Sequence, residues 1–202
     1  MTPGAGVTLV FMPGQPHAGL VREDLYAAAA QVHPEIEVVL VVEPGGRAAV
    51  VEEADRLGGL LSWRLFERAG GPAGVQFDDL LQAVQTPYCA IVPGLDLVYP
   101  RFAAVLVAAL ISDAGAVAAC GGGYLAEGAL EPFGFRATSK TRWMPPDPPG
   151  SAPVDIPLAG LLARTEALAA VGTLSDTAAR LADRGRVVSV PATVFERRVA
   201  FP

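Results

Sequence analysis

Hydrophobic and polar positions alternate between two patterns over the first 126 residues. Short, continuous apolar runs rich in β-branched residues and bounded by proline or glycine predict buried strands. Longer stretches with apolar residues at helical spacing lie between them and predict helices. The strands are expected within residues 7–12, 35–46, 60–70, 87–93 and 116–126, and the helices within residues 20–32, 47–58, 76–85 and 101–113.

This regular alternation of strands and helices predicts an α/β fold. The sheet should be mostly parallel, because each pair of strands is joined through a helix, and helices should cover both of its faces. Right-handed crossovers then bring the functional loops together at the carboxyl ends of the strands. The sequence therefore places any site at that edge of the sheet.

The alternation stops after Glu131. Residues 142–160 are crowded with proline and predict an extended loop. Short helices are expected within residues 164–172 and 177–186, and a last strand or pair of strands within residues 187–198. At 202 residues the chain is most simply one domain, residues 1–202, with halves at residues 1–128 and 129–202.

The composition of the chain argues against three classes of protein: nucleic-acid-binding, membrane-spanning and secreted proteins. With 51% hydrophobic and 18% charged residues the chain can bury a core, and a net charge of -6 argues against broad nucleic-acid binding. The longest clean apolar run, residues 102–111, is too short to span a membrane, and the N-terminus lacks the basic region of a signal peptide. Cys89 and Cys120 lie in apolar runs, which predicts reduced, buried thiols and a cytoplasmic protein.

Four segments, in this order, resemble a known family. They read "QVHPEIEVVLVV", "TPYCAIVPGLDLVYPRFAAVLVAAL", "LLARTEALAAVG" and "RLADRGRVVSVP". The ordered set is similar to family-2 glycosyltransferases with the GT-A fold, in which a three-layer, Rossmann-like sheet is flanked by helices. The resemblance implies that residues 1–128 bind a nucleotide-diphospho-sugar and that residues 129–202 face a glycan acceptor. The implied activity is that of a hexosyltransferase in glycan or cell-surface polysaccharide biosynthesis.

The resemblance also implies residues that hold the donor nucleotide. Pro13 is retained from the family's first nucleotide loop, although the polar residues around it are not. Glu43 stands where an acid accepts hydrogen bonds from the base, and it could equally be an exposed turn residue. The family's Arg-Asn pair is replaced by Phe77 and Asp78. Asp78 could substitute for the Asn, or Asp78 and Asp79 could be first-turn acids favoured by the helix dipole.

The turn that holds the metal in this family is reduced to one acid. Pro93, Gly94, Leu95 and Asp96 align with what is often a run of four acids. Asp96 is the predicted ligand for Mg²⁺ or Mn²⁺, since one carboxylate and the oxygens of a diphosphate can hold such an ion. Alternatively, Asp96 caps or orders the turn before the helix.

The general base of the family has one candidate in this sequence. The acidic stretch that carries it in the family is shortened, and only Asp176 remains near the expected place. The order Ser175-Asp176-Thr177 before a helix favours an N-cap for Asp176 over a catalytic role. Glu131 and Asp155 are further carboxylates whose spacing identifies no role.

Basic residues of the second half offer two more candidates. Arg136, Lys140 and Arg142 with Trp143 could bind a sugar or phosphate, or they could form a solvated face. The segment 196–198, Glu-Arg-Arg, matches a region that can approach the diphosphate in the family. His17 could contact phosphate from the first loop, whereas His33, before Pro34, is expected to be structural.

Two functions from different classes follow. The chain is either an active, divergent glycosyltransferase or a GT-A scaffold that has lost catalysis and serves as a binding or assembly module for a protein partner. A dinucleotide-binding Rossmann protein is disfavoured, because no G-x-G-x-x-G follows the first strand.

Overall fold

The computed structural model describes residues 5–12, 18–43, 45–57, 59–68, 73–145 and 156–201. The strands are β1 (Val7–Met12), β2 (Ile36–Val42), β3 (Ser62–Glu67), β4 (Tyr88–Pro93), β5 (Leu97–Val98), β6 (Ala116–Glu131), β7 (Gly134–Trp143), β8 (Leu161–Arg164) and β9 (Arg186–Ala200). The helices are α1 (Ala18–Ala29), α2 (Arg47–Arg56), α3 (Ala73–Gln82), α4 (Phe102–Ser112), α5 (Thr165–Ala169) and α6 (Thr177–Ala182), with a 3₁₀ turn at Leu158–Gly160.

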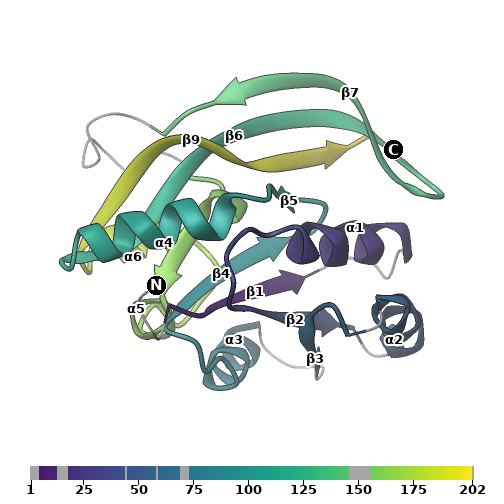
Figure 1. The fold of residues 1–202 in the computed structure, drawn as a ribbon, viewed down its shortest axis with the longest axis horizontal. Coiled ribbons are helices and arrows are strands. Elements are labelled where there is room, and N and C mark those ends of the chain that lie inside the picture. Colours follow the sequence, from purple (N-terminus) through teal and green to yellow (C-terminus); the bar gives the residue numbers. More distant parts are fainter. Residues whose placement is uncertain are drawn as a thin grey trace.

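The first half of the chain forms the parallel sheet that the sequence predicts. Its strands lie in the order β3-β2-β1-β4, and every neighbouring pair is parallel. β1 and β4 are buried along nearly their whole length, as continuous apolar runs require, whereas β3 forms the edge and is half-exposed. The predicted strands and helices of this half are confirmed, and the carboxyl ends of the parallel strands lie at one edge of the sheet (Figure 1).

The second half makes the sheet mixed. β8 lies antiparallel between β4 and β6, and β9 then pairs with β6 in parallel. The strand predicted to end at residue 126 continues to Glu131 and turns back as β7, where the sequence predicted no element. β7 was missed because most of its side chains are polar and exposed, so no apolar alternation marks it. Together β6, β7 and β9 form a curved arch above the parallel strands (Figure 1).

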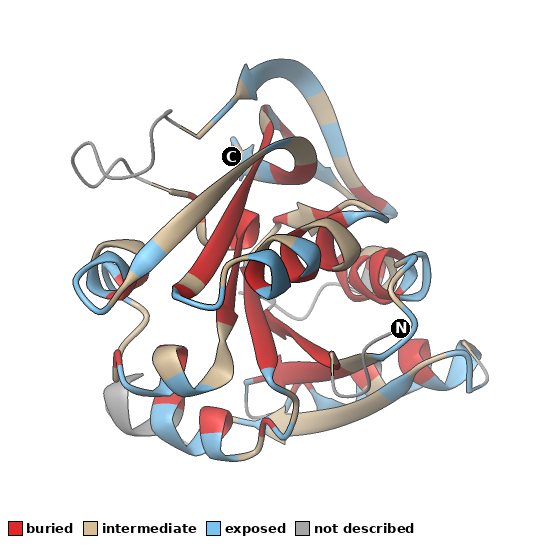
Figure 2. Cartoon of the chain, turned by 60° about the vertical axis from the view of Figure 1, so that its left-hand side comes forward, coloured by how far each residue is buried: buried red, intermediate tan, exposed pale blue. Residues whose placement is uncertain are grey.

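Helices cover both faces of the sheet, so the fold has three layers. On one face, α1, α2 and α4 pack against alternate residues of the central strands, including Phe11 and Leu40. On the other face, α3, α5 and α6 cover the remaining set, including Val10 and Ile91. Figure 2 shows the central strands buried along most of their length, with exposed residues on the outer sides of the helices.

Glycines in β6 let an aromatic ring approach the backbone. A Cβ on Gly123 would lie 2.5 Å from the ring of Phe195, and one on Gly160 would lie 2.6 Å from the same ring. Phe195 is fully buried, and Trp143 packs against it edge to face with ring centroids 5.7 Å apart. These contacts join the arch to the core of the parallel half.

Two further predictions concern the chain as a whole. Cys89 and Cys120 are both buried and unpaired, as their apolar surroundings predicted. Among the described helices, none combines the length and the hydropathy needed to cross a membrane.

Candidate functional site

The turn between β4 and β5 stands at the carboxyl edge of the sheet. Gly94 adopts a positive φ of 60°, which glycine reaches without steric cost, and its N–H donates to the carbonyl of Met12 at 2.9 Å. The N–H of Asp96 donates to the carbonyl of Pro93 at 3.1 Å, which closes the turn. The turn therefore ties the ends of β1 and β4 together and fixes where Asp96 lies.

Asp96 joins this turn to β9. Its side chain is buried, with 7% of the residue exposed, and Oδ1 accepts a hydrogen bond of 2.9 Å from the backbone N–H of Arg198. Burial raises the pKa of the Asp96 carboxyl to about 6, while the hydrogen bond from Arg198 and the charges of Arg197 and Arg198 act in the opposite direction. The hydrogen bond of the carboxylate thus ties the turn to β9, whereas the N-cap position of α4 is held by Arg101. Metal binding by Asp96 stays a prediction.

Asp96 and Asp176 line the same cavity. The cavity has a volume of about 470 Å³. Arg197 also lines it, since β9 carries this side chain past the turn, and Arg197 is close enough to lower the pKa of Asp96. The cavity is lined by Pro93, Asp96, Ile156, Pro157, Leu158, Leu174, Asp176, Thr177, Ala178, Ala179 and Arg197. Two predicted site residues, 80 positions apart in sequence, are therefore brought together.

Asp176 occupies the N-cap position of α6, as the sequence favoured. Its side chain makes no capping hydrogen bond to the helix, so the position is confirmed and the capping interaction is absent. Asp176 has φ 56° and ψ 27°, and no other non-glycine residue in the described part of the chain has a positive φ. The hydroxyl of Thr177 donates to the carbonyl of Leu174 at 2.8 Å and helps to hold this bend. Aspartate is among the residues that tolerate this left-handed conformation, and here the residue in that conformation lines the cavity.

A second, smaller cavity of about 30 Å³ adjoins the first. It is apolar apart from one arginine, and its lining consists of Met12, Val41, Phe66, Arg68, Phe77, Leu80 and Leu174. Leu174 lines both cavities, so the two form neighbouring parts of one region along the carboxyl ends of β1 to β4.

Glu43 lies beside Arg68 at this edge. Glu43 follows β2, Arg68 follows β3, and Nη1 of Arg68 lies 2.7 Å from Oε1 of Glu43. The backbone N–H of Arg68 donates to the carbonyl of Val42 at 2.8 Å, which continues the ladder between these two strands. Sequence reasoning missed Arg68. One clue was available in the sequence. Arg68 directly follows β3, and β3 lies beside β2, the strand that Glu43 follows.

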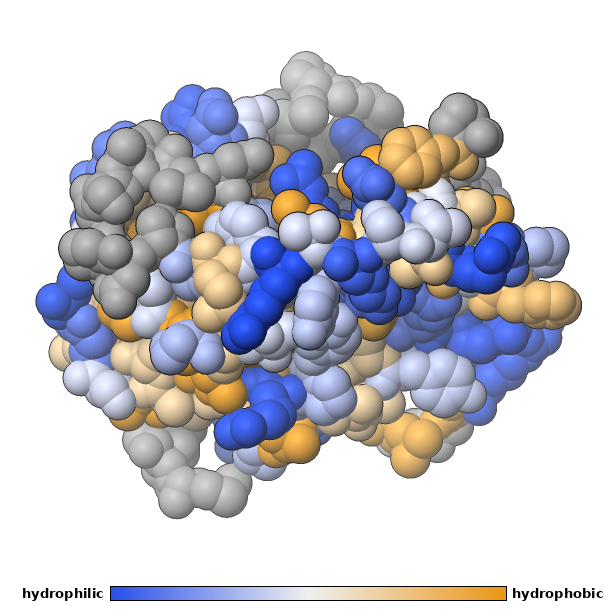
Figure 3. Space-filling model, turned by 90° about the horizontal axis from the view of Figure 1, so that it is seen from above, coloured by the Kyte–Doolittle hydropathy of each residue, from blue (hydrophilic) through white to orange (hydrophobic). Residues whose placement is uncertain are grey.

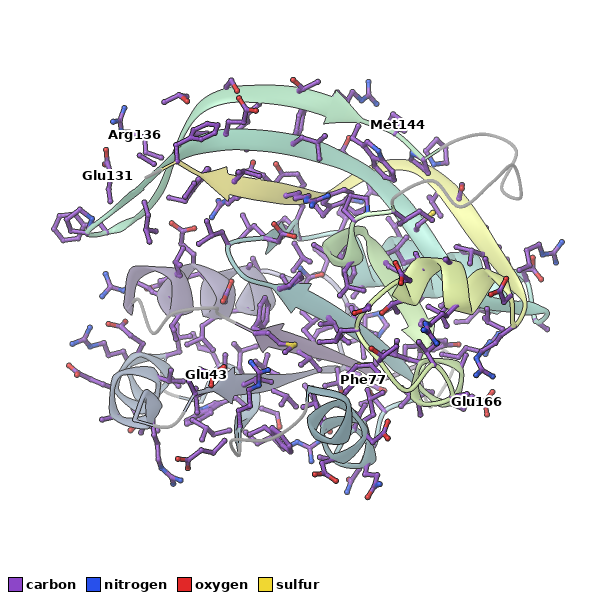
Figure 4. All side chains as sticks on the ribbon, turned by 180° about the vertical axis from the view of Figure 1, so that it is seen from behind. Glu43, Phe77, Glu131, Arg136, Met144 and Glu166 are labelled. Carbon is purple, nitrogen blue, oxygen red and sulfur yellow. The ribbon has the colours of Figure 1, made fainter. Side chains whose placement is uncertain are left out.

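Asp78 is not brought into this region. α3 begins at Ala73, so Asp78 lies in its second turn, and the interpretation of Asp78 and Asp79 as first-turn acids is wrong. Asp78 is exposed and lines neither cavity, whereas its neighbour Phe77 is buried against the smaller one. Figure 4 labels Phe77 and Glu43 in the lower, parallel half of the molecule. Pro13, His17 and Asp155, which the sequence also singled out, lie outside the residues that the structure describes.

Two basic residues of β7, Arg136 and Lys140, lie in ion pairs. Nζ of Lys140 lies 2.5 Å from Oε2 of Glu196, and Arg136 pairs with Glu131 near the tip of the β6–β7 hairpin, away from Glu43 and Phe77 (Figure 4). Seen from above, the arch mixes hydrophilic side chains with scattered hydrophobic ones (Figure 3). Trp143 packs inward on Phe195, so the four residues do not form one cation–aromatic surface.

Glu196 and Arg198 form a buried charge network behind the turn. Glu196 accepts hydrogen bonds from the Tyr99 hydroxyl at 2.9 Å and from Nε of Arg198 at 2.8 Å. Arg198 also pairs with Glu23 of α1. The network holds β9 against α1 and β5, which fixes the backbone that donates to Asp96. His33 is structural as predicted, with Nε2 2.8 Å from the carbonyl of Ala5.

Comparison with known proteins gives structural matches without sequence matches. No protein-family profile and no curated protein sequence matches the chain. The solved structure of S. aureus TarS residues 1–349 in complex with UDP-GlcNAc superposes with a TM-score of 0.64 at 13% identity, over 98% of this chain and 59% of that one. Mannosyltransferase PcManGT from Pyrobaculum calidifontis, in complex with GDP-Man and Mn²⁺, gives 0.62 at 17% identity, over 98% of this chain and 57% of that one.

These matches establish the fold. The chain has the GT-A-like architecture of glycosyltransferases, as predicted, and spans about three fifths of the length of the structures it matches. Membership of family 2 in particular stays a prediction.

Proposed function

We propose that this chain is a glycosyltransferase that moves a hexosyl group from a nucleotide-diphospho-sugar to the hydroxyl of a glycan acceptor. The observation that carries the proposal is the cavity in which Asp96, Asp176 and Arg197 meet at the carboxyl edge of the sheet. Two structures of the same fold hold UDP-GlcNAc and GDP-Man, which supports a nucleotide-sugar as the donor.

Asp176 is the proposed general base. It is exposed, lines the cavity and makes no capping hydrogen bond with its side chain, so its carboxylate is available to an acceptor hydroxyl. The carboxylate would take the hydroxyl proton while the oxygen attacks the anomeric carbon of the sugar. The bond from that carbon to the diphosphate breaks, and the nucleoside diphosphate leaves with the bonding electrons. Arg197 supplies positive charge in the same cavity for the departing diphosphate.

The site offers a divalent cation the smallest number of protein ligands that such an ion accepts, a single carboxylate. Among the described residues, no three His, Cys, Asp or Glu side chains group as a metal centre. Mg²⁺ and Mn²⁺ are nevertheless commonly held by one or two carboxylates together with substrate phosphates, and Asp96 is the proposed protein ligand. When bound, the ion would neutralise charge on the diphosphate.

A second candidate is a GT-A scaffold that binds a protein partner or a sugar without turnover. It is favoured by the turn itself, because Pro93, Gly94 and Leu95 supply no carboxylates. The two functions differ in whether the donor is consumed.

Calorimetric titration of UDP- and GDP-sugars, with Mn²⁺ and with a chelator, tests donor binding, and release of UDP or GDP in the presence of candidate glycans tests turnover. Asp176→Asn should lower turnover by about 100-fold or more and leave donor affinity within about threefold, since a general base contributes about 10²–10⁴ to a rate. Asp96→Ala should weaken binding in Mn²⁺ more than in chelator.

Asp183→Asn is the matched control, because Asp183 follows α6, is exposed and does not line the cavity. It should leave binding and turnover unchanged. Absence of binding by every nucleotide-sugar would contradict the enzyme proposal, and binding without release under any condition would favour the scaffold.

A further inference from the structure

The outer side of α4 is an apolar surface. The helix contains no charged residue from Phe102 to Ser112, although 18% of the chain is charged. Its inner side, which includes Phe102, Leu106 and Leu110, is buried, and the helix lies on the outside of the molecule (Figure 1). A helix that is apolar on all sides is normally buried on all sides. Here one side of such a helix is open to solvent.

A stripe of apolar side chains runs along this open side. Ala104, Ala108 and Ile111 recur at helical spacing, and Ile111 is 49% exposed. Val32, which is 62% exposed, lies beside the start of the helix, since its N–H donates to the carbonyl of Pro100 at 2.9 Å. Single exposed apolar residues are ordinary on a protein surface, whereas a contiguous apolar surface marks contact with another molecule.

The polar groups of α4 favour a protein over a lipid as that molecule. The hydroxyl of Ser112 donates to the carbonyl of Ala108 at 2.8 Å, so it is satisfied within the helix. A helix that lies on a membrane carries lysine and arginine on its polar side, and α4 contains neither. The net charge of -6 also opposes contact with anionic lipids.

The charges at the two ends of α4 complement a second copy of the same helix. Exposed Arg101 precedes the helix and Asp113 follows it, at equal distances in sequence from Val107. When two copies pack antiparallel about a two-fold axis at this level, Arg101 of each copy lies beside Asp113 of the other. It also lies beside the negative end of the other helix dipole. Asp113 already pairs with Arg186, and its carboxylate oxygens have further acceptor positions.

We propose that α4 is the contact between two copies of this chain in an antiparallel, two-fold dimer. The small side chains of Ala104 and Ala108 let the two helix axes approach closely, and Ala108 lies next to the two-fold axis. One helix of 11 residues, about 16 Å long, presents less area than a standard stable interface. The dimer should therefore dissociate with a Kd on the order of 10–100 µM.

This dimer leaves the candidate site open. α4 packs on the face of the sheet opposite α6, and no residue of α4 lines either of the two cavities. Dimerisation is therefore independent of whether the chain transfers sugars.

Sedimentation velocity between about 5 and 500 µM measures the association. The wild-type chain should shift from monomer to dimer over this range. Ala108→Arg places two like charges at the axis and should raise the Kd at least about tenfold, and Arg101→Glu should raise it about threefold or more. Ala48→Arg makes the same change at an exposed alanine of α2 and should leave the Kd unchanged.

Disulfide cross-linking tests the geometry. Ala108→Cys should form an intermolecular disulfide under mild oxidation, because the two copies of residue 108 face each other across the axis. The native thiols of Cys89 and Cys120 are buried and should not contribute. Ala48→Cys is the control and should yield little cross-linked dimer.

The outcomes decide between a second copy and other occupants of this surface. A chain that stays monomeric up to about 500 µM would overturn the dimer. Binding of that monomer to phosphatidylglycerol vesicles would assign α4 to a membrane surface instead. A dimer that Ala108→Arg does not weaken, or equal cross-linking of Ala48→Cys and Ala108→Cys, would place the contact elsewhere. Circular dichroism verifies that each variant is folded.

Discussion

At the scale of single residues, the buried acid Asp24 of α1 couples the stability of the fold to pH. It is 5% exposed, and burial raises the pKa of its carboxyl well above the ordinary value. The negative charges of Glu23 and Asp96 act in the same direction, and Arg198 opposes them. Asp24 is therefore protonated in the folded protein at pH values where the unfolded chain has already lost that proton.

Asp24→Asn should make folding less sensitive to rising pH. In the wild type, the unfolded state ionises at this residue above about pH 4, so the free energy of unfolding falls as pH rises toward the raised pKa of the folded state. The asparagine variant lacks this loss, and its stability relative to wild type should increase between pH 4 and pH 8. Urea denaturation across that range measures the difference. A constant difference at every pH would show that Asp24 does not titrate in this way.

At the scale of elements, the packing of β6 against β9 depends on glycines in β6. The sequence shows three glycines in a row at residues 121–123, a pattern that weakens strand propensity. The structure gives the reason, because Phe195 of β9 lies where a Cβ on Gly123 would stand. This close approach lets β9 seat an aromatic ring beside the turn that carries Asp96.

Gly123→Ala should destabilise the protein by about 1–3 kcal/mol, the usual cost of overpacking a core. The ring of Phe195 has little room to move, since Trp143 packs against it. Gly115→Ala is the control, because the nearest atom to its new Cβ would be 3.6 Å away and the site is exposed, so about 0.5 kcal/mol or less is expected. Urea denaturation compares the two. Equal stability of the variants would mean that β6 and β9 adjust without cost.

At the scale of the whole molecule, the two halves of the sequence share one sheet. β8, from the second half, is inserted between β4 and β6, and β9 closes the other side of β6. Neither half holds its own core, because the residues packed around Phe11 and Leu162 come from both. We therefore expect residues 1–202 to behave as one cooperative unit.

The two tryptophans can test this expectation, since Trp63 lies on β3 of the first half and Trp143 on β7 of the second. The variants Trp63→Phe and Trp143→Phe each leave one reporter. Their fluorescence transitions in urea, each compared with the far-UV circular dichroism of the same variant, should coincide. Two separated transitions would show that the halves unfold independently.

The residues of the site were only partly predictable. Asp96 and Asp176 were named from the sequence, but their meeting in one cavity depends on where α6 and β9 pack. Asp176 does stand at the N-cap of α6, but its side chain makes no capping bond, and a local pattern cannot show that the backbone bends to positive φ there. Arg68 was missed because a half-buried arginine after a strand gains significance only from the glutamate beside it.

The sequence by itself determined the parallel half of the fold. Buried parallel strands need continuous apolar runs, and crossover helices need apolar residues at helical spacing. Both are local sequence patterns, and both are present within residues 7–113. The tertiary structure alone decided the arch, the position of β8 and the grouping of Asp96, Asp176 and Arg197. These depend on contacts between residues far apart in the chain, and no local pattern of hydrophobicity specifies which distant strand a given strand will join.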